Sequence, residues 1–343
     1  MAPDRAEGEA RVTMAQLAGE AGTSVATVSK VLGGRPGVSA AKRDQVLAVA
    51  EAAGYRPRGG GPKPRRLIEL VMRGIDTLWA TQMLVAAEAE TSRAGVGRVL
   101  SVTHRRPMGN RHWLANLAAR RPDGLVLVVS RLQTGAEKEL MRLRIPTVLV
   151  DPIGVAPEGM PVIGATNFAG GLSAAEHLIS LGHRKIGIIA GDRYLNCSQE
   201  RLDGYRAALI RAGIEPREDY VRFGDFQTEG GRAGAESLLS LPDPPTAIFA
   251  GSDQQAYGAY VAARAKGLRI PEDLSVVGFD DVPLAQWVSP RLTTVRQPLG
   301  AMAAEATRLA MRMAYERVAP VGSKVELATE FVLRDSTAPP RAP

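Results

Sequence analysis

Apolar residues recur with two different periods along the chain, and the change of period divides it into two parts. Up to about residue 54 they stand three or four positions apart, which predicts short amphipathic helices. From residue 67 onward, short and nearly continuous apolar runs alternate with amphipathic stretches. This second pattern is typical of parallel strands that are covered by helices on both faces. We therefore predict a small all-α domain followed by a larger α/β domain.

The amino-terminal pattern predicts three capped helices. Thr13 is placed to cap the first, with Gln16 completing a capping box, and Gly22 ends it. Ser24 and Ser39 are placed to cap the second and third helices, and the third ends at residue 54. The residues expected to face inward are Met14, Leu17, Ala18 and Ala21 in the first helix, Val25, Val28, Val31 and Leu32 in the second, and Val46, Leu47, Ala50 and Ala53 in the third.

Only the residues GTS separate the first two predicted helices, which is the geometry of a helix-turn-helix. The second helix of such a unit can lie in the major groove of DNA with its first turn against the base edges. Val25 and Ala26 would then offer small apolar surfaces, and Lys30 would reach guanine acceptors or a phosphate. The short donors suited to phosphate oxygens are Ser24, Thr27 and Ser29. A helical hairpin with ordinary caps fits the same pattern.

Eight strands are predicted after residue 66, at 67–72, 97–103, 124–130, 147–151, 185–191, 220–225, 246–251 and 274–281. The stretches 167–182 and 252–267 are predicted helices between them. So many alternating units predict two doubly wound, parallel-sheet lobes. We place lobe one at about 67–166 and 297–323, and lobe two at about 167–290 and 324–336.

Positive charge is concentrated near the amino terminus. The segment 11–66 holds ten Lys or Arg against three acidic residues, whereas 67–343 holds 32 against 30. Such a local excess is expected of a segment that meets a polyanion. We divide the chain into a tail (1–10), a DNA-binding domain (11–57), a basic linker rich in Gly and Pro (58–66) and a two-lobed domain (67–343).

Composition excludes several classes of protein. The chain is 45% hydrophobic and 23% charged, as in soluble globular proteins, and its start lacks the basic and apolar regions of a secretory signal, so we expect it in the cytoplasm. The single Cys197 leaves no internal disulfide. No histidine stands in a metal-ligand or triad spacing, and no phosphate-binding glycine motif follows a strand. We expect neither catalysis nor a cofactor or metal.

Ligands of open parallel sheets bind beyond the carboxyl ends of the strands, so we searched those positions for polar and aromatic residues. They hold Leu78, Trp79, Asp151, Arg201, Phe226, Ser252, Asp253 and Asp280. Aromatic faces together with carboxylates and a guanidinium suit a polyhydroxylated ring. As alternatives, Asp253 and Asp280 could be helix-capping carboxylates, and Trp79 could be a core residue. We expect Arg201 to open the helix after 185–191 and to face Asp280 across one cleft.

Residues 12–57, VTMAQLAGEAGTSVATVSKVLGGRPGVSAAKRDQVLAVAEAAGYRP, resemble the DNA-binding head of the LacI/GalR repressor family. The resemblance continues through LGHRKIGIIAG, RLDGYRAAL, AIFAGSDQQAYGAY, DLSVVGFDD and PRLTTVRQP. It implies a repressor that binds a pseudo-palindromic operator as a homodimer, with a tetramer left open, under the control of a small effector, expected to be a sugar or sugar derivative. A sugar-binding protein of a transport system shares the two-lobed fold and is the alternative.

The resemblance also implies residue roles. The implied DNA contacts are Thr13, Ser24, Val25, Ala26, Thr27, Ser29, Lys30, Arg35, Tyr55 and Arg56. The implied effector contacts are Leu78, Trp79, Asp151, Arg201, Phe226, Ser252, Asp253, Asp280 and Gln297.

The linker departs from the family pattern. Members usually have a longer connector that forms a hinge helix, from which a leucine wedges into the minor groove. Here the connector contains GGGPKP, and both Gly and Pro oppose helix formation, so we expect no leucine wedge. Two interpretations stay open: a flexible solvated linker, or basic residues that follow phosphates or enter a narrow minor groove, namely Arg56, Arg58, Lys63, Arg65 and Arg66.

Overall fold

The computed structural model describes residues 12–33, 36–53, 55, 66–104, 109, 111–129, 132–133, 135–316 and 324–341. The chain divides into two compact units between Arg65 and Arg66. The linker residues 58–65 lie outside the described residues. Arg66 belongs to the larger unit, where its guanidinium lies 4.7 Å from the ring centroid of Tyr315. Its expected place in the linker is thereby corrected.

The first unit is a three-helix domain made of α1 (Met14–Glu20), α2 (Val25–Leu32) and α3 (Ala40–Ala52). The predicted capping box of α1 is present, with the Gln16 N–H donating to Thr13 Oγ1 and the Thr13 N–H donating to Gln16 Oε1. Gly22 follows α1 with a φ of +54°, a conformation that favours glycine and ends the helix. Ser24 caps α2 through the Thr27 N–H, whereas Ser39 makes no side-chain cap bond.

A small apolar core holds these helices together. Its buried members are Leu17, Ala18, Ala21, Val28, Val31, Val46 and Ala50. Two of the residues expected to face inward do not: the side chains of Val25 and Leu47 are 46% and 45% exposed. The core of so small a domain is filled by about two residues per helix turn, which leaves the outer apolar positions in solvent.

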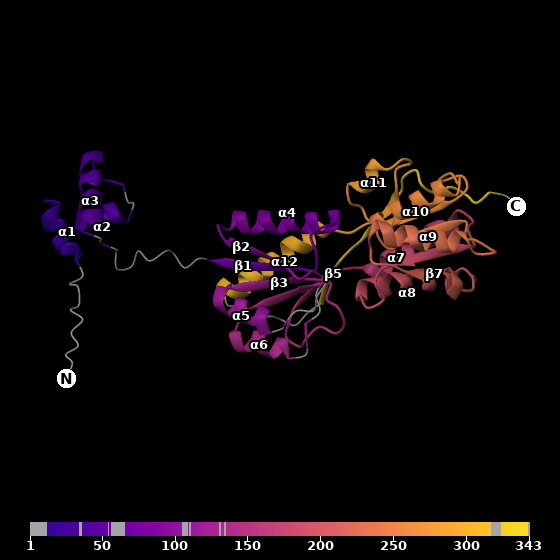
Figure 1. The fold of residues 1–343 in the computed structure, drawn as a ribbon, viewed down its shortest axis with the longest axis horizontal. Helices are drawn as coiled ribbons and strands as arrows, with labels where there is room; N and C mark the ends of the chain where they lie inside the picture. The colour runs from indigo at the N-terminus through magenta and orange to yellow at the C-terminus, as the bar shows by residue number, and fades with distance from the viewer. Residues whose placement is uncertain are drawn as a thin grey trace, which may run out of the picture. The chain divides into compact units, whose positions relative to one another are not determined.

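The second unit contains two six-stranded sheets (Figure 1). The first has the order β11-β5-β4-β3-β1-β2 and is parallel throughout, with β1 (Leu67–Met72), β2 (Gly97–Val102), β3 (Gly124–Val128), β4 (Thr147–Val150), β5 (Val162–Ala165) and β11 (Lys324–Leu327). The second has the order β12-β10-β9-β8-β6-β7 and is parallel except at β10–β12, with β6 (Ile186–Ala190), β7 (Val221–Phe223), β8 (Ala247–Ala250), β9 (Ser275–Asp280), β10 (Thr293–Arg296) and β12 (Glu330–Val332). The prediction of two doubly wound parallel lobes is confirmed.

Helices cover both faces of each sheet (Figure 1). In lobe one, α4 (Leu78–Arg93) and α12 (Leu299–Tyr315) pack on one face, and α5 (Arg111–Arg120) and α6 (Ala136–Leu143) on the other. In lobe two, α7 (Asn167–Ser180) and α8 (Asn196–Arg211) pack on one face, and α9 (Thr228–Leu239) and α10 (Asp253–Ala265) on the other. The short elements η1 (Glu218–Tyr220) and α11 (Leu284–Trp287) complete lobe two. Among the described helices, none combines the length and apolarity that crossing a bilayer requires.

Four strands were missing from the sequence prediction, namely β5, β10, β11 and β12. One of them corrects a boundary: the segment 324–327, expected in lobe two, pairs with β5 in the sheet of lobe one. Within the described residues the chain therefore passes between the lobes after β5, after β10 and after β11. The first and third crossings are tied together, since the hydroxyls of Thr166 and Thr329 lie 3.0 Å apart and the Thr329 N–H donates to Thr166 Oγ1.

Candidate DNA interface and ligand cleft

The second helix of the three-helix unit keeps one face free of the core. Val28 and Val31 are buried, whereas Val25, Ala26, Ser29 and Lys30 are exposed. These four positions lie at i, i+1, i+4 and i+5, so they share one side of a helix. The face combines two small apolar side chains, a hydroxyl and an ammonium, which is the set expected to contact thymine methyls, phosphates and guanine acceptors.

The other predicted DNA contacts divide into three groups. Thr13 and Ser24 cap α1 and α2, the Thr27 N–H donates to Ser24 Oγ, and the Ser24 and Thr27 hydroxyls lie 2.9 Å apart. Tyr55 is half-buried and packs against the three-helix core. Arg35 and Arg56 lie outside the described residues.

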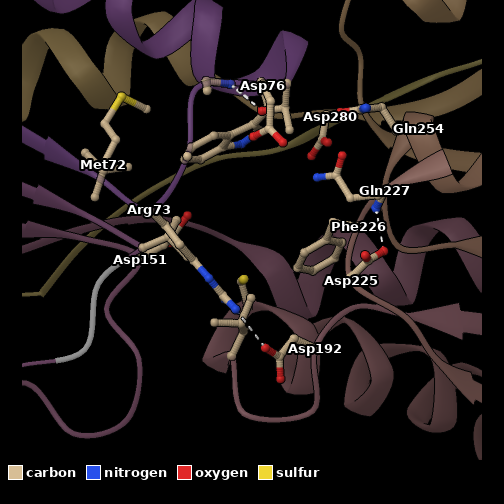
Figure 2. A pocket seen from close by; sticks show the side chains of 18 of the residues that line it. Met72, Arg73, Asp76, Asp151, Asp192, Asp225, Phe226, Gln227, Gln254 and Asp280 are labelled. Atoms are coloured by element: carbon tan, nitrogen blue, oxygen red, sulfur yellow. Dashed lines mark hydrogen bonds and ion pairs between the residues drawn. The ribbon is translucent and has the colours of Figure 1, made fainter. Parts of the chain in front are cut away.

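A cleft between the carboxyl edges of the two sheets encloses about 880 Å³, part of it continuous with solvent. Lobe one contributes the ends of β1, β3 and β4 and the first turn of α4. Lobe two contributes the segments after β6 and β7, the end of β9, the first two turns of α8 and the first turn of α10. Figure 2 shows Arg73, Asp76 and Asp151 on the side of lobe one, with Phe226, Gln227 and Asp280 opposite them. Five of the nine predicted ligand contacts line this cleft, namely Trp79, Asp151, Arg201, Phe226 and Asp280.

Arg201 is held rigidly in the floor of the cleft. It lies in the second turn of α8 rather than at the start of the helix as expected, and it is only 4% exposed. Its Nε–H donates to Asn167 Oδ1 at 3.0 Å, its Nη1 donates to the carbonyl of Gly251, and the guanidinium lies 3.7 Å from the ring centroid of Phe279. Gly171 permits this placement, because a Cβ at that position would lie 2.2 Å from the Arg201 carbonyl oxygen.

Asp280 stands beside Arg201 and not across the cleft from it. Both residues belong to lobe two, and Asp280 Oδ1 lies 3.8 Å from Arg201 Nη1 and accepts a hydrogen bond from Gln297 Nε2 at 2.6 Å. The expectation that the two bind a ligand from opposite sides is therefore wrong. Burial raises the pKa of Asp280 to about 6, although Arg201 and Gln297 both favour the ionised form.

Asp151 is a carboxylate from lobe one that lines the same cleft. It follows β4 with a φ of +43°, which an Asp adopts more readily than most residues because its short side chain tolerates the left-handed region. Burial raises the pKa of Asp151 to about 7, and the nearby Arg201 offsets only part of that effect. Near neutral pH both protonation states of this group are therefore populated, so it can either donate or accept a hydrogen bond.

Aromatic side chains line both sides of the cleft. Trp79 comes from the first turn of α4, and Phe226 comes from the segment after β7. Phe226 has a φ of +66° and packs on Gly191, where a Cβ would lie 2.0 Å from the Phe226 Cζ atom. The left-handed backbone and the missing side chain at Gly191 together turn the Phe226 ring toward the cleft.

The other four predicted ligand contacts lie away from the cleft wall. Leu78 packs against the core of lobe one. Ser252 caps α10, whereas the buried Asp253, for which a helix cap was the alternative, instead accepts hydrogen bonds from Thr294 Oγ1 and the Val282 N–H. Gln297 lines a neighbouring hollow and acts on the cleft through Asp280.

Several cleft residues were not singled out from the sequence, among them Arg73, Asp76, Asp192, Asp225, Gln227 and Gln254. Arg73 and Asp192 form an ion pair of 3.1 Å that joins lobe one to lobe two, as Figure 2 shows. Arg73, Asp192 and Asp225 each stand one or two residues beyond a strand end. The positions at which the strand-end rule looked for ligand contacts therefore include these three residues, which were passed over.

Cys197 also lines the cleft, but its thiol is unreactive. It is 8% exposed, and burial raises the pKa of its thiol to about 12. A thiol with such a pKa stays protonated at neutral pH and is a poor nucleophile.

Comparison with known proteins finds the same two parts. The family model described as bacterial regulatory proteins, lacI family, matches residues 13–58, and the periplasmic binding protein-like domain matches residues 175–337. The transcriptional repressor CytR of Escherichia coli (strain K12) is 32% identical over 334 residues, which cover 96% of this chain and 97% of CytR. The transcriptional regulator CelR of Thermobifida fusca is 34% identical over 350 residues, which cover 96% of this chain and 99% of CelR.

Comparison with solved structures agrees with these sequence matches. The complex of the regulator CelR with cellobiose is 31% identical, has a TM-score of 0.74, and covers 95% of this chain and 100% of its own. The lac repressor dimer bound to operator and an anti-inducer is 26% identical, has a TM-score of 0.77, and covers 96% of this chain and 100% of its own.

Proposed function

The chain belongs to the LacI family of bacterial DNA-binding transcriptional regulators, and we propose that it is a repressor whose affinity for its operator is changed by a bound sugar or sugar derivative. The observation that carries the proposal is the presence, in one chain, of a helix-turn-helix with an exposed face on α2 and a cleft lined by carboxylates, guanidiniums and aromatic rings. The alternative of a transport protein is not supported, because relatives that match 96% of the chain are named as transcriptional regulators.

The three-helix unit is the proposed DNA-binding part. Its core fixes α2, so that Val25, Ala26, Ser29 and Lys30 can meet base edges and phosphates together. A single unit of this size buries little surface on DNA, and two of them on a pseudo-palindrome supply the usual affinity of such regulators. We therefore propose a homodimer, a state that the lac repressor shows on its operator. A DNA-bound regulator acts where the DNA is, which in bacteria is the cytoplasm.

The cleft is the proposed effector site. The carboxylates of Asp151 and Asp280 are placed to accept hydrogen bonds from ligand hydroxyls, Arg201 to donate them, and Trp79 and Phe226 to contact the C–H faces of a ring. The relative CelR has been solved with cellobiose, which is consistent with a sugar ligand. We propose no reaction for this site.

Control of DNA binding follows from the two-lobed construction. The ligand contacts come from both lobes, so a ligand favours the lobe arrangement in which it touches both. Two further contacts join the lobes: the Arg73–Asp192 ion pair, and the hydrogen bonds between Asn196 and the backbone of Gly154. A change in the lobe arrangement would break these contacts or form them anew. In a dimer, a change of lobe angle alters the spacing of the two DNA-binding units.

The division of labour is testable with the full chain and the fragment 66–343, which is a separate compact unit. An operator is first selected from random duplexes by the full chain, and its affinity is then measured by fluorescence anisotropy for both proteins. The full chain should bind with a steep salt dependence, and the fragment should not bind while it retains its folded circular dichroism. Equal affinity of the folded fragment would refute the assignment of DNA binding to the three-helix unit.

A further inference from the structure

Three exposed arginines precede three neighbouring strands in the sheet of lobe one. Arg66 precedes β1, Arg121 precedes β3 and Arg144 precedes β4, and these strands are neighbours in the order β4-β3-β1. Parallel strands begin at the same edge of a sheet, which we call the amino edge of lobe one. We propose that Arg66, Arg121 and Arg144 bind the phosphate backbone of the DNA that the three-helix unit recognises. This inference rests on the proposed function of the chain as an operator-binding regulator.

None of these three guanidiniums forms an ion pair within the described residues. Arg121 and Arg144 have no side-chain partner there, and Arg66 covers only the ring of Tyr315, 4.7 Å from its centroid. The segments between residues 34 and 323 that lie outside the described residues contain no acidic residue, so they supply no carboxylate either. An exposed guanidinium that no carboxylate neutralises is available to a phosphate, which it binds through two parallel N–H···O bonds.

Arg121 and Arg144 hold equivalent positions in the chain. Arg121 directly follows α5 and Arg144 directly follows α6, and the two helices pack on the same face of the sheet (Figure 1). Both arginines have a left-handed backbone, with φ values of +48° and +54°. Glycine is the usual residue where a helix ends in this conformation, because a side chain makes it less favourable. A strained backbone that carries an exposed charge at two equivalent positions suggests a role for the side chains.

The carboxyl ends of the two helices do not themselves require these arginines. A cation in the last turn of a helix is favourable, and the last turns of α5 and α6 already contain Arg120 and Arg142. Arg120 pairs with the buried Glu69, and Arg142 pairs with Glu139. The additional arginine at each helix end therefore places positive charge on the surface without a partner among the described residues.

The amino edge is also the edge to which the DNA-binding unit is joined. Residues 58–65 connect that unit to Arg66, which precedes β1. A connector of this length spans at most roughly 30 Å even when it is fully extended. DNA that is held by the three-helix unit therefore stays within reach of lobe one. The amino edge would extend to Arg121 and Arg144 the phosphate contacts considered for the basic linker.

Such contacts add affinity and no base recognition. Each phosphate that an arginine neutralises releases counterions, so the contribution falls as the salt concentration rises. The contacts are too few to hold DNA by themselves, and the fragment 66–343, which keeps this edge, should still not bind the operator at concentrations at which the full chain does. In the full chain they also connect lobe one directly to the DNA, so that a change in lobe angle alters operator affinity.

The test is the slope of the logarithm of operator affinity against the logarithm of KCl concentration, measured by anisotropy with the full chain. In a dimer, Arg121→Gly should reduce the magnitude of this slope by about 2, and Arg121→Gly combined with Arg144→Gly should reduce it by about 4. At low salt the double variant should bind at least tenfold more weakly, by the same factor on the operator and on base-substituted duplexes. Its unfolding midpoint should be unchanged or higher, because glycine adopts both φ values without strain.

Arg111→Gln is the matched control. Arg111 is exposed and begins α5, so it stands at the opposite end of the helix that Arg121 follows. Its replacement removes the same charge from the same lobe and should leave the slope and the affinity unchanged. An equal effect of Arg111→Gln would show that only the overall charge of the chain matters, and would overturn the proposed contact.

The remaining outcomes separate this contact from the function on which it rests. If the full chain selects an operator and the double variant keeps the slope of the parent, the contact with DNA is refuted and the operator-binding function stands. An edge that served an acidic protein partner would give that same result. A weaker affinity with an unchanged slope would also refute the contact. If the full chain selects no operator from random duplexes, the proposed function fails, and this inference fails with it.

Discussion

Replacement of Asp151 by Asn should change how the stability of the two-lobed unit depends on pH. Asp151 has its pKa raised from 3.8 to about 7, so the folded protein holds this proton more tightly than the unfolded chain does. Stability from such a group is present at low pH and is lost as the pH rises from about 4 to about 7. Asn keeps the shape of the side chain, tolerates the φ of +43° and carries no titrating proton.

The magnitude follows from the shift. A displacement of about three pKa units corresponds to about 4 kcal/mol between the two ends of the titration. Between pH 5 and pH 8 the part that is lost amounts to about 2–3 kcal/mol, because at pH 5 the unfolded chain is already ionised. The stability of Asp151→Asn relative to the parent should therefore improve by about 2–3 kcal/mol from pH 5 to pH 8, or roughly 3–5 °C in midpoint for a unit of this size.

Tryptophan fluorescence during thermal or urea unfolding is the appropriate assay. All three tryptophans, Trp79, Trp113 and Trp287, lie in the larger unit, so the signal reports on that unit within the full chain. Asp203→Asn, which removes a carboxylate from an exposed position of α8 outside the cleft, is the matched control, and its relative stability should be the same at both pH values. A difference near zero for Asp151→Asn, or one of opposite sign, would refute the claim that burial in the cleft raises the pKa of this carboxyl group.

Three further outcomes are expected. Lys30→Ala should weaken operator binding and, if Lys30 contacts a base, relax preference at one position per half-site by about 1–3 kcal/mol in a base-substitution matrix; an unchanged matrix and affinity would remove it from the interface. Arg201→Ala, or Asp280→Ala, should raise the effector concentration at half-response at least tenfold and leave effector-free DNA binding near that of the parent, and an unchanged midpoint would count against the site. Gly171→Ala should lower the free energy of unfolding by about 1–3 kcal/mol in urea titration, because its Cβ would meet the Arg201 carbonyl at 2.2 Å, whereas Gly300→Ala in α12, with only Ala86 at 3.9 Å, should cost nothing.

The strand-end rule identified much of the cleft because a parallel sheet collects its carboxyl ends at one edge. It therefore found Trp79, Asp151, Arg201, Phe226 and Asp280. It could not tell which side chains turn into the cleft, since this depends on local backbone angles such as the φ of +115° at Asp280. For that reason Ser252 and Asp253 were grouped with them, although they brace the start of α10 and the segment after β9.

The missed strands had weak sequence signals. β11 (KVEL) and β12 (EFV) are the edge strands of their sheets, are short and hold charged residues, so they lack the apolar runs of the central strands. Their pairing is decided by contacts with β5 and β10, which come from distant parts of the sequence. The boundary near residue 324 was misplaced for the same reason. The three-helix unit was easier to predict, because its caps and its core pattern are local.

The central claim is that a sugar bound in the cleft controls the affinity of the chain for its operator. The most direct measurement is operator binding by the full chain, followed by anisotropy, at increasing concentrations of a neutral sugar whose binding has been established by calorimetry. The account predicts that the operator dissociation constant changes at least fivefold over the range in which the sugar saturates the cleft, and that Arg201→Ala shifts this response to higher sugar concentration. A sugar that saturates the cleft and leaves the operator affinity unchanged would contradict it.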